Sequence, residues 1–227
     1  MLTPHLPVFV RQSRTTYRTD LVVCYVDGQG KSGQYYASRF AEENGIAAKC
    51  VSAADQFADV VAQLEKQDNN RVVAVAIIDD IVATGDTLSK KVADFISLHR
   101  AVLQSRGAFV GVIALLGTIA GEEAVRRRIA QLRGVEVELR ICEPLSIEYH
   151  AFENHNRIWS STSEMQEAKA LCTRLGATIY RTNPVGYGDL GLLVAFPNSC
   201  PNNSLPILHS PGRTETRWNP LLPRVAN

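Results

Sequence analysis

Long apolar runs are missing from this 227-residue sequence. A helix that crosses a membrane needs about 18 or more consecutive apolar residues, and no window approaches that length. The first residues, MLTPHLPVFVRQSRTTYR, also lack the positively charged and then apolar plan of a secretory signal peptide. We therefore expect a cytoplasmic protein that does not insert into a membrane.

The chain also lacks an excess of charge of one sign, because its formal net charge is +1. This balance gives no general reason to expect direct binding to nucleic acid or to a membrane surface. The cysteines are odd in number, widely spaced and without a C-x-x-C pair, which disfavours a disulfide framework or a zinc site. We expect five reduced, mostly buried thiols, at Cys24, Cys50, Cys142, Cys172 and Cys200.

Apolar residues make up 45% of the chain and charged residues 21%, as in ordinary globular proteins. Buried apolar runs alternate with segments of helical periodicity, which predicts an α/β fold with a doubly wound, mostly parallel sheet. The expected strands are 21–26, 46–52, 72–78, 108–116 and 135–141, and the expected helices are 34–44, 55–66, 88–104 and 121–132.

The C-terminal third breaks this alternation. A helix over 164–175 and a strand over 190–196 are expected there, but their surroundings are rich in Pro, Asn and Gly. We predict one domain over residues 1–227, with a core of about 20–142 and an irregular C-terminal hood and tail of about 143–227.

The most informative stretch is RVVAVAIIDDIVATGDTL, from Arg71 to Leu88. Its apolar run is expected to stop at Asp79 and Asp80, where open α/β sheets bind ligands. Small and hydroxyl residues follow at a strand-to-helix junction, so backbone N–H groups and the helix dipole converge on one point with little obstruction. We expect a phosphate there, although a capped helix without a ligand, with Asp86 or Thr87 as N-cap, is the structural alternative.

A second glycine-rich loop, DGQGKSG, lies between the first strand and the first helix. Its Gly30-Lys31-Ser32 ending matches that of a Walker A motif, but the glycine required five positions earlier is replaced by Tyr25. The spacing therefore excludes a nucleoside-triphosphatase loop. A glycine turn that carries an exposed lysine is the structural alternative to an anion site.

The segment IIDDIVATGDTL resembles the phosphoribosyl pyrophosphate (PRPP) loop of the type I phosphoribosyltransferases. The resemblance implies that Asp79 and Asp80 are the catalytic carboxylates, that they bind the ribose hydroxyls, and that they share Mg²⁺ with the substrate. It also implies that the 5′-phosphate is bound by Ala83, Thr84, Gly85, Asp86 and Thr87.

The same resemblance implies roles for two further segments. The pyrophosphate loop would comprise Asp27, Gly28, Gly30, Lys31 and Ser32. In such enzymes a variable hood selects the base, and the candidates here are Tyr187, Phe196 and Asn198, for which packing or turn formation is the alternative role.

One departure from the family pattern affects the expected activity. Many catalytic members carry a long mobile loop between the pyrophosphate and PRPP loops, whereas only Asp68-Asn69-Asn70 remains here as an obvious loop. Three hypotheses are therefore kept: the first is an enzyme that makes or breaks an N-glycosidic bond on PRPP or a nucleotide, and the second is a catalytically silent nucleotide-binding regulatory module. A purely structural interaction protein is the third.

Three segments, GQGKSG, IDDIVATGDT and YGDLGLLVAFPNSCPNNSLPIL, also resemble phosphoribosyltransferase-like proteins of bacterial conflict systems, including retron anti-phage cassettes. That resemblance implies contact with nucleic acid only indirectly, within a retron complex. The proline-rich tail from Pro206 to Pro223 is a candidate clasp for a protein partner or a second copy of the chain.

Overall fold

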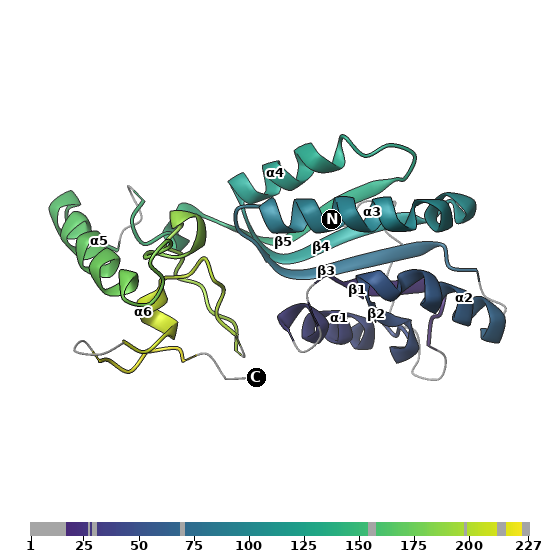
Figure 1. Cartoon of the computed structure of the whole chain (residues 1–227), viewed down its shortest axis with the longest axis horizontal. Coiled ribbons are helices and arrows are strands. Elements are labelled where there is room, and N and C mark those ends of the chain that lie inside the picture. Colours follow the sequence, from purple (N-terminus) through teal and green to yellow (C-terminus); the bar gives the residue numbers. More distant parts are fainter. Residues whose placement is uncertain are drawn as a thin grey trace. The chain divides into compact units, whose positions relative to one another are not determined.

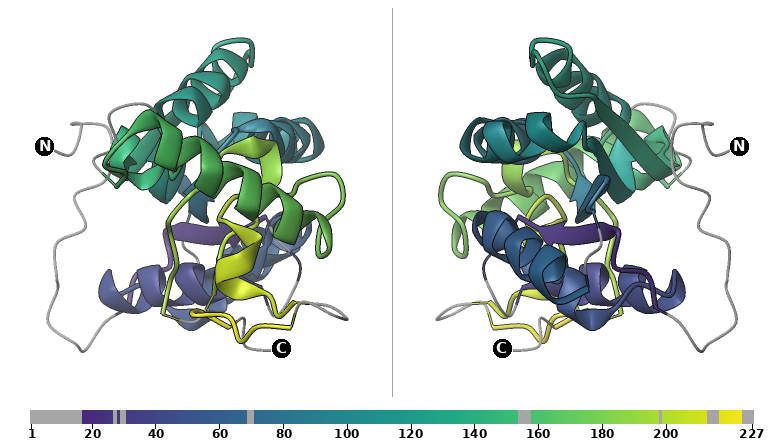
Figure 2. Two further views of the ribbon diagram at one scale, coloured as in Figure 1. Left: turned by 90° about the vertical axis from the view of Figure 1, so that its left-hand side faces the viewer. Right: turned by 90° about the vertical axis from the view of Figure 1, so that its right-hand side faces the viewer.

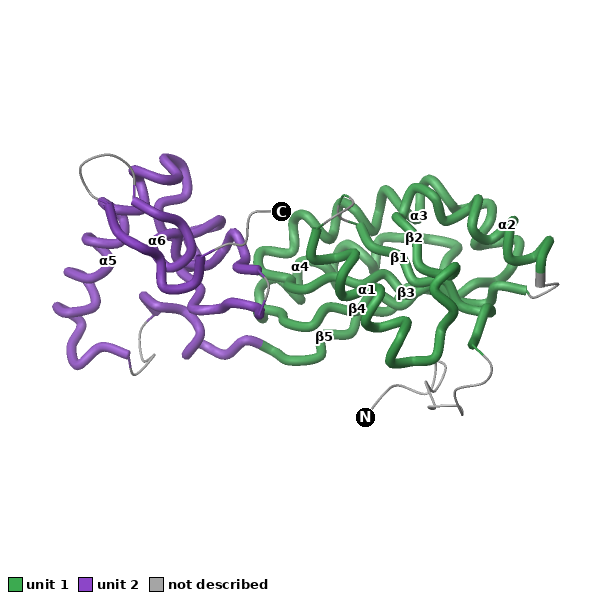
Figure 3. Tube along the Cα trace, turned by 90° about the horizontal axis from the view of Figure 1, so that it is seen from below, with its two compact units in different colours: residues 1–144 green, residues 145–227 purple. Residues whose placement is uncertain are grey.

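The computed structural model describes residues 17–26, 28, 31–68, 71–153, 158–197, 199–212 and 217–223. It divides into two compact units, residues 1–144 and residues 145–227, and each is described by itself (Figure 3). The division falls close to the predicted boundary between core and hood. Within the described ranges, no helix has both the length and the apolar content needed to cross a bilayer.

The first unit contains a five-stranded parallel sheet in the order β2-β1-β3-β4-β5. This confirms the predicted α/β, doubly wound fold. The order reverses between β1 and β3, and ligands of such sheets bind at the carboxyl edge near that reversal. The strands are β1 (Leu21–Tyr25), β2 (Val51–Ala53), β3 (Ala74–Val82), β4 (Phe109–Thr118) and β5 (Val137–Leu145).

Helices cover this sheet, with α1 and α3 on opposite faces (Figures 1 and 2). Helix α1 packs against β1, β2 and β3, whereas α3 contacts both α2 and α4. The helices are α1 (Ser32–Glu43), α2 (Phe57–Asp68), α3 (Asp86–Arg106) and α4 (Ile119–Ile129), with short 3₁₀ turns η1 (Ala48–Cys50) and η2 (Ala54–Gln56) beside β2.

Side-chain size explains how α1 and α3 pack. Helix α1 buries Gly33, Ala37 and Ala41 at successive i, i+4 positions, and these small residues let it approach the strands closely. Helix α3 instead buries large apolar side chains along one face and ends at Gly107, whose φ of 57° suits a left-handed C-cap. The central strands are apolar on both faces, as expected for a covered parallel sheet.

The second unit contains the 3₁₀ turn η3 (Ile147–Tyr149), α5 (Thr162–Ala177), the 3₁₀ turn η4 (Tyr187–Asp189) and the one-turn α6 (Pro206–His209). Its small core is formed by Ala151, Cys172, Val185 and Leu205. Ser161 caps α5 by accepting the N–H of Glu164, and Glu164 accepts the N–H of Ser160, which is a reciprocal arrangement.

Several predicted strand boundaries were wrong, including that of β5, which was expected to end at residue 141 and ends at Leu145. Strand β3 does not stop at Ile78, because its pairing with β4 continues to Val82. The expected strand over 46–52 is reduced to a single bridge at Ile46 and the short β2. Residues 190–196 form no ladder: Leu192 and Phe196 make isolated bridges, and the segment lacks a continuous partner strand among the described residues.

Candidate functional site

The predicted site segments leave the sheet at one edge. Strands β1 and β3 are adjacent and parallel, with Tyr25 paired to Ile78, and β3 is paired to β4 with Asp79 opposite Ala114. Because the carboxyl ends of parallel strands face the same way, the loops after these strands all emerge at the carboxyl edge. The structure therefore brings the predicted pyrophosphate and phosphate loops to a common edge.

The two candidate carboxylates lie within β3 rather than after it. Asp79 is 8% exposed and its Oδ1 accepts the N–H of Asp80 at 3.0 Å. Asp80 is partly buried and its Oδ1 accepts the N–H of Ile81 at 2.9 Å. Successive strand residues project to opposite faces, so the two side chains leave β3 in opposite directions close to its carboxyl end.

The electrostatics of Tyr36 identify the side on which Asp80 lies. Burial, and then the negative charge of Asp80, raise the pKa of this α1 phenol to about 12. Because α1 packs on β3, the Asp80 carboxylate belongs to the α1 face. Asp79 consequently faces the side covered by α3.

The phosphate loop joins β3 to α3 through Ala83, Thr84 and Gly85. Gly85 is the N-cap of α3, with a left-handed φ of 81°, so the structural alternative with Asp86 or Thr87 as N-cap is wrong. The cap supplies no side chain, and Thr84 Oγ1 accepts the N–H of Asp86 only at 3.4 Å. The first-turn N–H groups of a 21-residue helix therefore point out of the loop, as an anion site requires.

The neighbouring β4–α4 turn supports this loop from beneath. Thr118 Oγ1 donates to the carbonyl of Ala83 at 2.5 Å and accepts the N–H of Gly121 at 3.0 Å. A Cβ on Gly85 would lie 2.5 Å from the carbonyl oxygen of Gly121, so the two backbones touch. Our sequence reasoning missed these positioning residues, although the small-residue run GTIAG after a buried strand was a usable signal.

The predicted pyrophosphate loop is described in part. The carbonyl of Gly28 accepts the N–H of Lys31 at 3.2 Å, and Lys31 is the exposed N-cap residue of α1. Ser32 begins that helix. Asp27 and Gly30 lie outside the described residues.

The three hood candidates do not share one described cavity. Tyr187 is 44% exposed at the start of η4, and its carbonyl accepts the side-chain amide of Asn203 at 2.9 Å. Phe196 lines a cavity of about 180 Å³ together with Leu221 and Leu222, and Tyr187 is not among the residues that line it. Asn198 lies outside the described residues.

The described part of the tail packs on its own unit. Trp218 Nε1–H donates to the carbonyl of Ile207 at 3.0 Å, and the Leu222 N–H donates to the carbonyl of Leu208 at 2.8 Å. The tail as a clasp for a partner or a second copy stays a prediction.

The Asp80 carboxylate of β3 fits magnesium held jointly with a substrate. Among the described residues, no group of three or more His, Cys, Asp or Glu side chains is placed to hold a metal ion. Mg²⁺ prefers oxygen ligands and is often bound by one or two carboxylates plus substrate phosphates. Within the described ranges Asp80 accepts only the Ile81 N–H through Oδ1, which leaves Oδ2 for such a role.

The doubly wound parallel sheet, with its glycine-rich loops at the carboxyl edge, defines an α/β protein of the kind that binds ligands at that edge. The sequence model of the PRTase-CE family matches residues 6–224, nearly the whole chain, and the chain belongs to this family. No curated protein and no solved structure matches it.

Proposed function

We propose that the protein binds PRPP or a nucleotide together with Mg²⁺ and makes or breaks an N-glycosidic bond at the anomeric carbon. The observation that carries this proposal is the position of Asp79 and Asp80 on the strand that feeds the phosphate loop. One continuous segment, residues 79–87, would thereby bind both a hydroxyl group and the phosphate of the sugar. Membership of the PRTase-CE family supports the substrate class.

Each part of the segment has a distinct task in this proposal. The carboxylates of Asp79 and Asp80 accept hydrogen bonds from the ribose hydroxyls, since ionised carboxylates only accept. The backbone N–H groups of residues 83–87 donate to the 5′-phosphate, aided by the α3 dipole. Lys31, the N-cap residue of α1, would meet the diphosphate in this proposal. When bound, Mg²⁺ would neutralise charge on the diphosphate.

Mass analysis of what the full-length chain consumes tests the proposal directly. The protein is incubated with PRPP, a pool of nucleotides and Mg²⁺. We expect Asp79→Asn or Asp80→Asn to reduce turnover by about a hundredfold or more, because interactions with the reacting sugar are lost, while circular dichroism stays unchanged. Asp59→Asn, on the exposed face of α2, is the matched control and keeps full turnover. Undiminished turnover in both β3 variants would contradict the proposal.

A second candidate, a catalytically silent nucleotide-binding regulatory module, is favoured by one observation. Strand β2 runs directly into η2 and α2, and β3 begins shortly after α2 ends at Asp68. The described residues between the two loops are thus taken up by regular elements and short connections, without a long loop that would exclude water from the reacting sugar. This candidate predicts thermal stabilisation by a nucleotide without base release or diphosphate formation.

For the biological setting we propose an anti-phage role of the retron type, on the resemblance of three sequence segments alone. A phage challenge of cells that carry the cassette with Asp79→Asn tests this role. Protection equal to that of the unaltered cassette would separate any defence role from the β3 carboxylates.

A further inference from the structure

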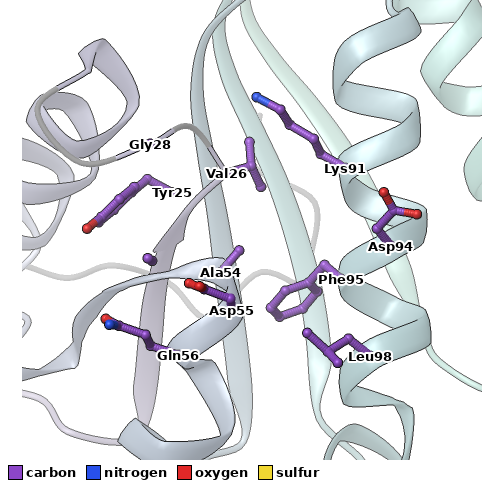
Figure 4. Close-up of a pocket in the computed structure, with 11 residues that line it drawn as sticks. Tyr25, Val26, Gly28, Ala54, Asp55, Gln56, Lys91, Asp94, Phe95 and Leu98 are labelled. Atoms are coloured by element: carbon purple, nitrogen blue, oxygen red, sulfur yellow. The ribbon is translucent and has the colours of Figure 1, made fainter.

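The direction of Tyr25 shows which face of the sheet the last residues of β1 occupy. Strand β1 ends beside a cavity of about 520 Å³ that is lined by residues of β1, of the segment after β2 and of α3 (Figure 4). The Tyr25 ring extends from β1 away from Phe95 and Leu98 of α3 (Figure 4). Since α1 and α3 cover opposite faces of the sheet (Figures 1 and 2), Tyr25 projects on the α1 face.

The register of β1 and β3 places Asp80 on the same face as Tyr25. Tyr25 is paired with Ile78 in the parallel ladder, so the two side chains project to the same side. Asp80 follows Ile78 by two strand positions, and the ladder to β4 continues without interruption to Val82. The Asp80 side chain therefore also lies on the α1 face, closer to the carboxyl end, in agreement with its electrostatic effect on that helix.

Tyr36 of α1 lies close to this carboxylate. The small buried residues of α1 bring the helix close to β3, and Tyr36 stands next to one of them, Ala37. Tyr36 and Phe40, one helical turn apart, are partly buried against the core of the sheet. After burial, the negative charge of Asp80 is the next largest cause of the raised pKa of the Tyr36 phenol. Packing and charge thus make Tyr36 and Asp80 neighbours at the carboxyl edge.

The geometry of α1 directs the Tyr36 side chain toward the predicted substrate. In a helix the Cα–Cβ bond tilts toward the N-terminus, and a long side chain lies over the preceding turn. The turn before Tyr36 begins at Ser32, with Lys31 as the N-cap residue. Because α1 follows β1, this N-terminus lies at the carboxyl edge, where open α/β sheets bind ligands. The phenol is therefore carried toward the edge at which Asp80 and the phosphate loop lie.

A phenol and a carboxylate side by side can recognise a single hydroxyl group. A hydroxyl group both donates and accepts hydrogen bonds, whereas an ionised carboxylate only accepts and a neutral phenol can donate. The pKa of Tyr36, raised to about 12, keeps the phenol protonated at neutral pH, so it retains its donor. A carbon-bound hydrogen in place of the hydroxyl group would use neither partner.

We propose that Tyr36 is a specificity-determining residue that selects, together with Asp80, one hydroxyl group of the ribose. That hydroxyl donates its hydrogen to the Asp80 carboxylate, and its oxygen accepts the phenolic O–H of Tyr36. The inference rests on the function proposed above, because it concerns the same sugar. It adds a residue of α1 that belongs to neither of the two loop motifs.

Calorimetric titration of the full chain with ribose 5-phosphate and with its 2-deoxy and 3-deoxy forms, at one Mg²⁺ concentration, tests this role. We expect Tyr36→Phe to weaken ribose 5-phosphate binding about fivefold, because one hydrogen bond is lost while the ring stays in place. One deoxy sugar should lose the same factor, and the other should be unaffected because it lacks the oxygen that the phenol binds. Tyr35→Phe is the matched control: the Tyr35 ring is 49% exposed and contacts Tyr36 edge-on, so all three affinities should stay unchanged.

Equal weakening of all three sugars would assign the phenol a structural role and overturn the proposal, as would an unchanged affinity of Tyr36→Phe for ribose 5-phosphate. Because the result is a ratio between sugars measured on one variant, a partial loss of folded protein cannot imitate it. Failure of the unaltered chain to bind ribose 5-phosphate would contradict the proposed function and remove this inference with it. Binding that is insensitive to Tyr36→Phe would remove this inference alone.

Discussion

The two units satisfy their backbone polar groups in different ways. In residues 1–144 the strands form continuous parallel ladders, such as the eight paired positions between β3 and β4. In residues 145–227 the described strand contacts are isolated bridges, and turns supply much of the remaining hydrogen bonding, as between Gly191 and Val185. A ladder fixes a residue by register, whereas a turn fixes it only through its own few contacts.

Replacing a buried glycine with a larger residue should therefore have different effects in the two units. Gly121 abuts the carbonyl of Val82, the last residue of β3, and that of Ala83, which follows it directly. Gly176 of α5 abuts the carbonyl of Pro184, which belongs to a turn. A Cβ at position 176 would overlap the Pro184 carbonyl oxygen even more closely than a Cβ at position 121 would overlap that of Ala83, but we expect the turn to shift and the strand end, held in a five-stranded sheet, to resist.

The largest effect is expected for Gly121→Ala, because its Cβ would collide with two backbone carbonyls of the rigid unit. We expect a loss of about 3 kcal/mol or more in the free energy of unfolding, measured by urea denaturation. Gly107→Ala is the control: its Cβ would meet nothing within 4 Å, so only the left-handed φ opposes it, at a cost of about 1 kcal/mol.

A smaller effect is expected for Gly176→Ala, since the Pro184 turn can move away at a cost of about 1–3 kcal/mol. Hydrogen exchange should quicken in α5 and stay unchanged in β3. Gln166→Ala, on the exposed face of the same helix, should leave both rates unchanged. If Gly176→Ala proved more damaging than Gly121→Ala, the contrast between a rigid and a yielding unit would be wrong.

The smallest effect concerns the Arg18–Asp20 ion pair near the start of β1. The hydrogen bond from Arg18 lowers the pKa of Asp20 below its ordinary value. A lowered folded-state pKa adds stability above the unfolded pKa of about 3.9, and this stability is lost as pH falls through the lower folded-state value. Because the pair is partly exposed, we expect Asp20→Asn to cost less than about 1 kcal/mol at pH 7.

Urea midpoints at pH 7 and at pH 2 measure this contribution. The difference between the unaltered protein and Asp20→Asn should shrink as the pH falls toward 2, because protonation of Asp20 removes the charge that pairs with Arg18. A difference that persists at pH 2 would assign the effect to packing of the side chain instead of its charge.

Most of the first unit could be predicted from the sequence, because its buried apolar residues either form continuous runs, as in covered strands, or recur with the spacing of a helix. Continuous apolar runs located β1, β3 and β4, and spaced apolar residues located α3. The end of β3 was misplaced because Asp79 and Asp80 look like loop residues, yet each binds the next backbone N–H while the ladder continues. Local composition cannot reveal a pairing that is set by a neighbouring strand.

The candidate site was predicted in part for a similar reason. The motif at residues 79–87 is contiguous, so its residues were found from sequence alone. Thr118 and Gly121 were missed because they act on it from 35 or more residues away. The cavity between the end of β1, the segment after β2 and α3 was missed because its lining residues are far apart in the sequence and only the fold assembles them, with a hydrogen bond between His99 and Ala54 linking two of the elements. In the second unit, the apolar run 190–196 has the composition of a strand but makes only isolated bridges with the described residues.

Because the backbones at Gly85 and Gly121 are in contact, a movement at the start of α3 is passed directly to the start of α4. Because no side chain separates the two glycines, an anion bound at the β3–α3 loop should also reduce the motion of the β4–α4 turn. Slower amide hydrogen exchange at the start of α4 would therefore indicate that the anion site at the β3–α3 loop is occupied, although α4 is not part of that site.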